Sequence, residues 1–423
     1  MATPLRATLA IRRATVATCD GALHDPGLRA AHAIAVERDR VAWIGPDDAL
    51  PSHADLSGAQ VIDAGGRLVS PGLVDFHTHL VFGDDGSRAE EFAALSAGRS
   101  YGDVARAGGG IAATMRATRA ASDAELVGTA RTRARRLLAW GVTTFEVKSG
   151  YGESIDEELR ILRVIRDLGR TVSGEQDVVA TALPLHALPS GRDRERWVRE
   201  VVEVLLPVVA HEGLASACDA FVAETAFTAG EARRVLAAAR ALGLAPRLHA
   251  DQLSDDQSAA LAAEVGASSA DHLEHVGDAG IAALSRAGVV AGLLPASTLL
   301  LRGRAWAPGR RLVDGGVAVA IGSNLNPGSS MSENLGLALS LACLENGLTP
   351  GEAIWAATRG GARALRLEEA GRIAVGAPAD LVLWGARSPS HLCWHAGVNH
   401  VRCVVKRGRV VHEAGEPASA DCA

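Results

Sequence analysis

The chain has 423 residues, 48% of them hydrophobic, and a formal net charge of −6 at pH 7. This length allows a large buried core and about two or three domains. The small negative charge and the absence of basic runs exclude a typical nucleic-acid-binding surface, so we expect a small-molecule partner. No apolar stretch is long enough for a membrane span or a signal peptide, so we expect no membrane partner and a cytoplasmic location.

The two ends of the chain have the same pattern. Residues 1–66 contain short runs in which apolar and polar residues alternate, with turn residues between the runs. Alternation with a period of two is typical of β-strands that bury one face. Residues 371–423 repeat this pattern. Because neither end can bury a core alone, we predict that both ends together form one small β-sandwich-like domain.

Residues 67–370 instead alternate short apolar runs with longer helical patterns. The apolar runs are residues 73–79, 142–148, 178–186, 218–223, 245–250, 268–273, 289–294 and 317–323. Helical spacing is found at residues 123–140, 155–168, 229–242 and 254–265. Strands that alternate with helices indicate parallel βα units, and eight such units predict an α/β fold closed into a (β/α)8 TIM barrel. An open doubly wound sheet is the alternative, but no glycine-rich phosphate turn follows the first run.

Histidines gather at the C-terminal ends of these predicted strands. His77 and His79 end the first run, His186 ends the third, His249 lies in the fifth and His272 in the sixth. In a barrel these strand ends converge on the face where barrel enzymes have their active sites. His77 and His79 are two positions apart, so both imidazoles can point to the same side of the strand. Together with His249 they make a good ligand set for a divalent metal ion.

A metal hydrolase also needs a carboxylate near the ion, to take a proton from water and pass it to the leaving nitrogen. Two places suit this group: the position after the eighth run and the loop after His249. These places hold Asn324 and Gln252. An amide has nearly the shape of a carboxylate and can touch a metal weakly through its oxygen, but it does no acid–base work at pH 7.

Seven short motifs, in this order, closely resemble the imidazolonepropionase family of the amidohydrolase superfamily. They are "SPGLVDFHTHLVFG", "GGGI", "GVTTFEVKSGYG", "LHALP", "HADQL", "SADHLEH" and "NPGSS". "VDFHTH" marks only the superfamily, whereas "EVKSGYG" and "NPGSS" are far more specific. The family hydrolyses 4-imidazolone-5-propanoate to N-formimidoyl-L-glutamate in histidine degradation. The resemblance therefore implies a metal-dependent hydrolase of cyclic amides.

The resemblance also implies which residues form the site. It implies one divalent metal ion, zinc or iron, and a homodimer. The implied metal positions are His77, His79, His249 and Asn324. The implied catalytic positions are His272, Gln252 and Asn324.

The resemblance gives the other site residues to the substrate. Arg88 would bind the substrate carboxylate, for which the guanidinium fork is well suited. His186 would bind the ring or its carbonyl oxygen. The remaining substrate-binding positions are Tyr151, Gln252, Asn326, Gly328 and Ser329.

Two positions depart from the family pattern, which has Asp where this chain has Asn324 and Glu where it has Gln252. Three explanations fit these two amides: the chain is an engineered variant, a natural homologue with altered chemistry, or a protein that binds without turnover. We expect it to open the imidazolone ring, at a rate reduced by the two amides. The alternatives are an amidohydrolase that acts on a different ring, as a deaminase or lactamase, and a non-catalytic ligand-binding homologue.

Overall fold

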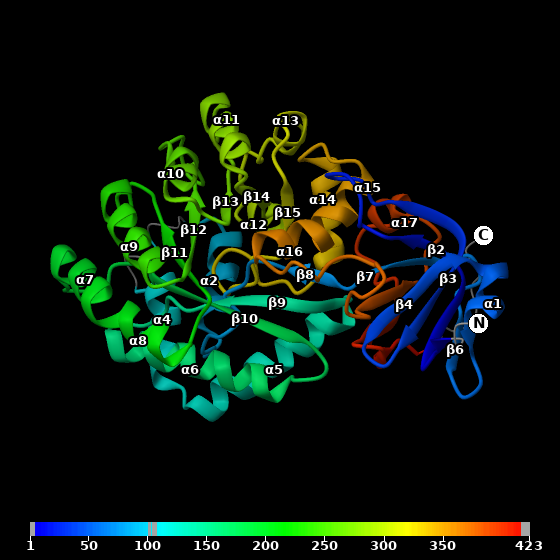
Figure 1. Ribbon diagram of the computed structural model, residues 1–423. Helices are drawn as coiled ribbons and strands as arrows, with labels where there is room; N and C mark the ends of the chain where they lie inside the picture. The colour runs from blue at the N-terminus through cyan, green and yellow to red at the C-terminus, as the bar shows by residue number, and fades with distance from the viewer. Residues whose placement is uncertain (1–4, 100–102, 104–107, 416–423) are drawn as a thin grey trace.

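The computed structural model describes residues 5–99, 103 and 108–415 (Figure 1). It has two parts that lie side by side. An 8-stranded parallel sheet is curled into a barrel with helices around it, and a second sheet is built from both ends of the chain. The predicted architecture is therefore confirmed.

The barrel strands follow one another in chain order around the sheet. They are β8 (Leu73–Asp75), β9 (Val142–Lys148), β10 (Asp177–Leu185), β11 (Ala217–Phe221), β12 (Ala245–Ala250), β13 (Ser269–His272), β14 (Val290–Leu293) and β15 (Val319–Ile321). Each overlaps one predicted apolar run. The two ends of the sheet meet through backbone hydrogen bonds: Asn324 N donates to His77 O at 3.0 Å, and His79 N donates to Leu325 O at 2.9 Å. The segments that bear the candidate ligands His77, His79 and Asn324 therefore also join the first barrel strand to the last.

Helices cover the outside of the barrel (Figure 1). They are α2 (Ser87–Ser96), α4 (Ile111–Ala120), α5 (Asp123–Ala139), α6 (Ile155–Thr171), α7 (Arg194–Glu200), α8 (Leu206–Glu212), α9 (Ala229–Ala241), α10 (Ser258–Val265), α11 (Asp278–Ala287), α12 (Pro295–Leu300), α13 (Gly309–Asp314), α14 (Leu335–Leu344), α15 (Pro350–Trp355) and α16 (Gly361–Ala364). Two π-helical turns, Val201–Leu205 and Ala356–Gly360, join α7 to α8 and α15 to α16. The helices α5 and α9 begin as predicted, since capping boxes at Ser122 and Thr228 satisfy their first backbone N–H groups.

Two predicted helix bounds are wrong. The helix predicted at residues 155–168 continues to Thr171 as α6. The helix predicted at residues 254–265 begins only at Ser258, as α10. Ser258 is held at this position by Asp251, whose backbone N donates to Ser258 Oγ at 2.7 Å and whose Oδ1 accepts from Ser258 N at 3.0 Å. The residues between them therefore form a loop after β12 rather than a first helical turn.

The second sheet joins the two chain ends. Its strands are β2 (Leu9–Ala17), β3 (Leu28–Glu37), β4 (Arg40–Pro46), β6 (Gln60–Asp63), β7 (Leu68–Pro71), β16 (Leu381–Trp384), β17 (Val401–Lys406) and β18 (Arg409–Glu413). The strand order is β18-β17-β16-β7-β2-β3-β4, and β6 also pairs with β2. Beside it, β1 (Leu5–Arg6) pairs with β5 (Ala54–Asp55), near the short helix α1 (Leu50–His53). β7 follows the predicted boundary at residue 66, and residues 416–423 of the predicted domain lie outside the described part of the chain.

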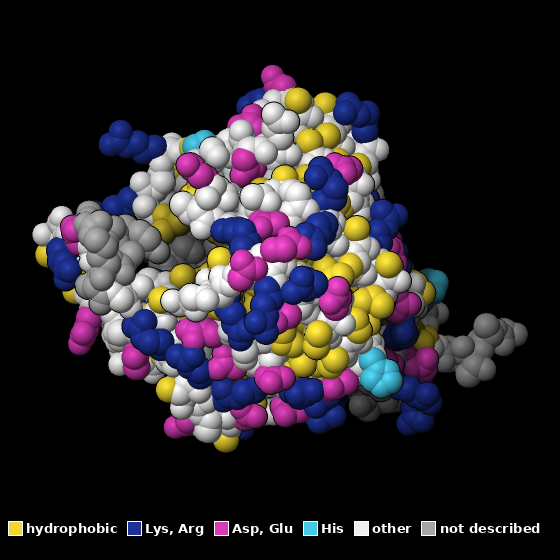
Figure 2. All heavy atoms as spheres, turned by 90° about the vertical axis from the view of Figure 1, so that its left-hand side faces the viewer, with side chains coloured by type: hydrophobic (Ala, Val, Ile, Leu, Met, Phe, Trp, Pro, Cys, Tyr) yellow, Lys and Arg dark blue, Asp and Glu magenta, His cyan; other side chains and the backbone are white. Residues whose placement is uncertain are grey.

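The surface has no single-sign charge field on the face shown in Figure 2, where Lys and Arg side chains alternate with Asp and Glu. Every helix in the described residues is too short or too polar to cross a lipid bilayer.

Candidate metal centre and active site

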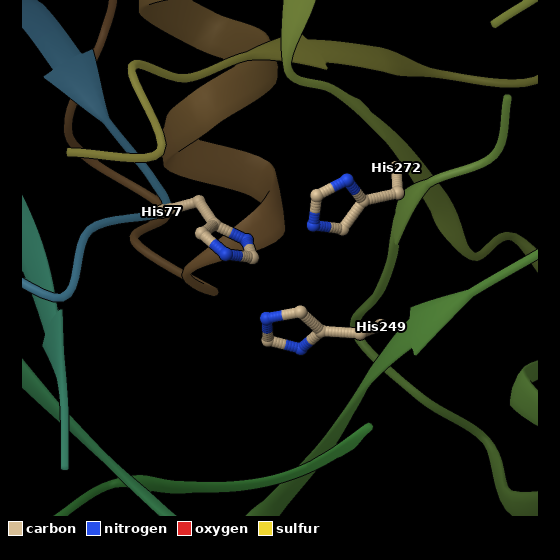
Figure 3. A group of neighbouring side chains, drawn as sticks. All are labelled: His77, His249 and His272. Atoms are coloured by element: carbon tan, nitrogen blue, oxygen red, sulfur yellow. The ribbon is translucent and has the colours of Figure 1, made fainter. Parts of the chain in front are cut away.

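Three buried histidines converge at the C-terminal end of the barrel strands (Figure 3). His77 follows β8, His249 lies in β12 and His272 ends β13. One ring nitrogen of each lies within 4.8 Å of the others. The ring centroids of His77 and His249 are 4.7 Å apart, and those of His249 and His272 are 5.3 Å apart. Histidines from three separate strands therefore face one small volume.

The other two predicted histidines lie at the edge of this group. The His79 ring is 5.4 Å from His77 and 5.7 Å from His249. It stacks on His186 at 4.9 Å with an interplanar angle of 21°. The Tyr151 ring is 5.5 Å from His186. The tightest grouping of nitrogens thus includes His272, whereas His79 lies between that group and the aromatic wall formed by His186 and Tyr151.

Two buried carboxylates orient the central imidazoles. Nδ1 of His77 lies 2.7 Å from Oδ2 of Asp271, and Nδ1 of His249 lies 3.1 Å from Oδ2 of Asp219. Burial and the nearby Lys148 ammonium lower the pKa of His77 well below its usual value, and burial lowers the pKa of His249. Both rings are therefore neutral, with Nδ1–H donating to the carboxylate and the Nε2 lone pair facing the shared volume.

A charge network lies beneath these carboxylates. Lys148 Nζ is 2.7 Å from Glu146 Oε1 and 2.8 Å from Asp219 Oδ2. Arg247 Nη2 is 3.1 Å from Asp271 Oδ2. Burial opposes ionisation of Asp271, but Arg247 and Lys148 outweigh it and lower the pKa of that carboxyl. Two cations thus contact three buried carboxylates below the histidines.

The sequence motifs did not identify the carboxylates and the arginine of this network as site residues. A signal was present, because charged residues occur two positions apart in otherwise apolar barrel strands. Glu146 and Lys148 have this spacing in β9, and Arg247 and His249 have it in β12. Residues two apart on a strand point to the same side, which here is the barrel interior.

The side chains present fit a divalent metal ion. Nε2 of His77, Nε2 of His249, Nδ1 of His79 and Oδ1 of Asn324 are buried without a hydrogen-bond partner. Such orphaned polar atoms are rare in folded proteins unless a ligand satisfies them. Imidazole nitrogens with one oxygen donor are typical of zinc and iron sites.

Asn324 lies at the start of a loop that Asn326 organises. Asn324 has a φ of 51°, and its Nδ2 lies 3.5 Å from Ser329 Oγ. Oδ1 of Asn326 accepts from the backbone N of Gly328 at 2.8 Å and of Ser329 at 2.7 Å. Nδ2 of Asn326 donates to Asn324 O at 2.6 Å and to Ser329 Oγ at 2.8 Å. The polar atoms of the Asn326 side chain are therefore all engaged inside the loop, where they fix its shape.

Arg88 lies against this loop from α2. Its Nε donates to Pro327 O at 3.4 Å, and its Nη1 is ion-paired with Glu91. A Cβ atom added at Gly328 would lie 2.9 Å from Arg88 Nη2, so glycine leaves room for the guanidinium. The structure thus brings together Arg88, Gly328 and Ser329 as the resemblance implied, although their contact with a substrate stays a prediction.

The loop that bears Tyr151 is fixed by a buried glutamate. Glu158 accepts from Gly150 N at 3.1 Å and from Gly152 N at 2.6 Å. Gly150 has a φ of +110°, and its O lies 3.0 Å from His186 Nδ1. Burial and the nearby His249 ring lower the pKa of His186 to about 4, so this ring is neutral at neutral pH.

Gln252 lies three residues after His249, in the loop that follows β12. Its side chain is partly exposed. Within the described residues, no side-chain hydrogen bond holds it in place. Its position near the strand end agrees with the predicted site, but its role stays a prediction.

Comparison with known proteins identifies the family. The sequence matches the amidohydrolase family over residues 68–411. The imidazolonepropionase of Anaeromyxobacter dehalogenans is 58% identical over 418 residues, which cover 98% of this chain and 99% of that protein. The chain belongs to the imidazolonepropionase family. A second relative, the imidazolonepropionase of Myxococcus xanthus, is 54% identical over 380 residues and 89% of each chain. The family predicted from the motifs is thus confirmed.

Solved structures share the fold of this imidazolonepropionase-family chain. The 5-methylcytosine deaminase of Klebsiella pneumoniae superposes with a TM-score of 0.72 at 16% identity, over 97% of this chain and 100% of that one. A zinc-bound adenosine deaminase of Xanthomonas campestris gives a TM-score of 0.68 at 20% identity, over 96% of this chain and 93% of that one. At these identities the likeness shows the fold alone.

Proposed function

We propose that this hydrolase opens the ring of 4-imidazolone-5-propanoate to give N-formimidoyl-L-glutamate, with one divalent metal ion, zinc or iron. The observation that carries the proposal is the convergence of buried histidines whose unpartnered nitrogens face one buried volume. The family to which the chain belongs supplies the substrate class. When bound, the ion would lower the pKa of water and polarise the ring carbonyl.

The proposed ligands are His77, His79, His249 and Asn324. Asp271 holds the His77 ring, and Asp219 holds the His249 ring, in the tautomer that leaves Nε2 free. His272 faces the same volume and lies close enough to orient the attacking water or polarise the carbonyl oxygen.

The proposed substrate contacts include two rings beside His79 and the loop that follows Asn324. Arg88 would bind the propanoate carboxylate through its planar fork, in competition with Glu91. His186 and Tyr151 offer ring faces that can pack against the flat imidazolone. The backbone of Gly328 and the side chain of Ser329 would line the end of the pocket.

The two amides limit the proton transfers. Asn324 can offer an oxygen to the metal, and Gln252 can hydrogen-bond the ring, but neither side chain gains or loses a proton near neutral pH. Among the proposed catalytic residues, only His272 belongs to a residue type that serves as a general acid or base. We therefore propose that the chain opens the ring more slowly than a form with carboxylates at both positions.

The test is the loss of ultraviolet absorbance of 4-imidazolone-5-propanoate, for protein stripped with a chelator and then reloaded with zinc or iron. We expect the stripped protein and the variant His249→Gln to be inactive, and reloading to restore turnover of the unaltered chain. The variant His412→Gln, in β18 of the terminal sheet, is the control and should keep wild-type activity. Turnover that survives in His249→Gln would contradict the proposed site.

Two further predictions concern the whole protein. The cytoplasmic location would be tested by fractionating the source cells, and the homodimer by sedimentation velocity.

A further inference from the structure

A second group of three histidines lies outside the candidate active site. His391 lies in the short helix α17 (Pro389–Trp394), and His395 is the C-cap residue of that helix. His400 directly precedes β17. One ring nitrogen from each lies within 4.8 Å of the others. The three pairs of ring centroids are separated by 4.9, 5.1 and 6.0 Å.

The backbone holds these histidines in place. His391 and His395 are four positions apart, a spacing that puts side chains on one face of a helical turn. His391 N donates to Ser388 Oγ at 3.3 Å, and His395 N donates to His391 O at 3.1 Å. On the other side, Gly385 N donates to His400 O at 2.6 Å at the edge of the sheet. The cluster is therefore organised by hydrogen bonds that do not use the imidazole rings.

The rings themselves leave polar atoms unsatisfied. Nδ1 of His395 and Nε2 of His400 are buried without a hydrogen-bond partner. Leaving buried polar atoms without partners is costly, and a shared cation would satisfy both nitrogens.

We propose that His391, His395 and His400 bind one divalent transition-metal ion of the zinc and copper class, at a site separate from the active site. The group consists of imidazoles, which suit zinc, copper and nickel, whereas magnesium and calcium prefer oxygen ligands. Three protein ligands leave further coordination positions to water.

The position of this site indicates a structural role. α17 packs against α14 and α15 of the barrel layer, while His400 leads into the terminal sheet (Figure 1). The neighbouring Asn399 donates from Nδ2 to Ala139 O at the end of α5, at 2.8 Å. An ion held here would link helix α17 to strand β17 where the barrel and sheet meet. Because the three ligands come together only in the folded chain, binding stabilises the fold.

The first test counts metal ions per chain. Untagged protein is stripped with a chelator, dialysed against Zn²⁺ and analysed for zinc and protein. We expect two ions per chain in the wild type, one in His395→Gln/His400→Gln, and one in His77→Gln/His249→Gln. The control His211→Gln/His412→Gln should keep two. One ion per chain in the wild type that is lost from His77→Gln/His249→Gln, or two ions in His395→Gln/His400→Gln, would overturn the proposal.

The second test uses Trp394, which is 80% exposed and has its ring 5.9 Å from His395 and 6.1 Å from His391. Cu²⁺ bound to the cluster should quench its fluorescence in a saturable titration that a chelator reverses. Trp394→Phe should lose this component of the quenching. The single variant His391→Gln keeps the backbone contacts and should also lose this quenching. It replaces His395→Gln/His400→Gln if that double variant does not fold. Saturable quenching that persists in His391→Gln at the same Cu²⁺ concentration would contradict the site.

Discussion

Oδ2 of Asp271 lies 2.7 Å from Nδ1 of His77, and both side chains are fully buried. Arg247 lies 3.1 Å from the same carboxylate oxygen, and Lys148 lies 3.8 Å from it. The two cations keep Asp271 ionised, and the ionised carboxylate keeps the proton of His77 on Nδ1. Arg247 and Lys148 therefore act through Asp271 to direct the lone pair of His77 Nε2 into the candidate metal centre.

Replacement of Asp271 should weaken metal binding at the candidate active site. In Asp271→Asn the amide no longer fixes the tautomer of His77, so we expect the affinity for zinc to fall by about 10–100-fold. Competition with a chromophoric chelator measures this affinity. Asp177→Asn is the matched control, because Asp177 lies at the opposite end of the barrel strands, 2.7 Å from Lys406. Equal zinc affinities of the two variants would show that Asp271 does not orient the ligand.

Replacement of Lys148 should destabilise the barrel. Lys148→Met leaves the carboxylates of Glu146 and Asp219 buried without their shared cation, and breaking such a buried pair costs about 3–5 kcal/mol. Urea unfolding of the metal-free protein measures the change. Lys406→Met is a useful comparison, since its partners Asp177 and Asp380 are 43% and 13% exposed, so water can reach both carboxylates. A smaller loss in Lys148→Met than in Lys406→Met would contradict the role of the network.

A methyl group at Gly328 should disturb substrate binding through Arg88. The added Cβ would lie 2.9 Å from Arg88 Nη2 and would push the guanidinium away from the loop. A lost charge-assisted hydrogen bond costs about 1.5–3 kcal/mol, so we expect KM to rise by about 10–100-fold with little change in kcat. Gly128→Ala is the control, because a Cβ there meets nothing within 4 Å. An unchanged KM in Gly328→Ala would place the substrate carboxylate elsewhere.

Glu158 should make the stability of the fold depend on pH. Burial raises the pKa of this carboxyl from 4.5 to about 7, so the folded protein binds the proton more tightly than the unfolded chain does. The resulting stabilisation is complete below pH 4.5 and is lost as the pH rises through 7; by linkage it amounts to about 3 kcal/mol at most. In Glu158→Gln, the decrease in unfolding free energy between pH 5 and pH 8 should be smaller than in the wild type. The exposed Glu203→Gln should behave as the wild type, and parallel pH profiles of all three proteins would refute the prediction.

The barrel could be predicted from the sequence because its signals are local. The apolar runs at residues 142–148 and 245–250 coincide with β9 and β12. The spacing of His77 and His79 correctly placed two imidazoles at the end of one strand. The start of α10 could not be predicted, because it depends on hydrogen bonds between Asp251 and Ser258 across the loop.

Which side chains pair with one another inside the site depends on tertiary contacts that no motif encodes. Asp271 and His77 are 194 positions apart in the chain, yet they form one hydrogen-bonded pair. Similarly, sequence spacing puts His79 on the same strand end as His77, but it does not predict that His79 stacks on His186. The histidines of the site were therefore predictable, whereas the carboxylates that orient them and the pairing among these residues were not.

The most direct test compares ring opening by this chain with ring opening by the double variant Asn324→Asp/Gln252→Glu, at matched metal content. Because a positioned acid–base group contributes about 10²–10⁴-fold, we expect the double variant to turn over 4-imidazolone-5-propanoate faster by at least about 100-fold. That result would show that the histidine cluster and pocket are those of an imidazolonepropionase that lacks its proton-transfer groups. Equal rates would contradict the proposed effect of the amides, and no turnover by either protein would contradict the proposed substrate.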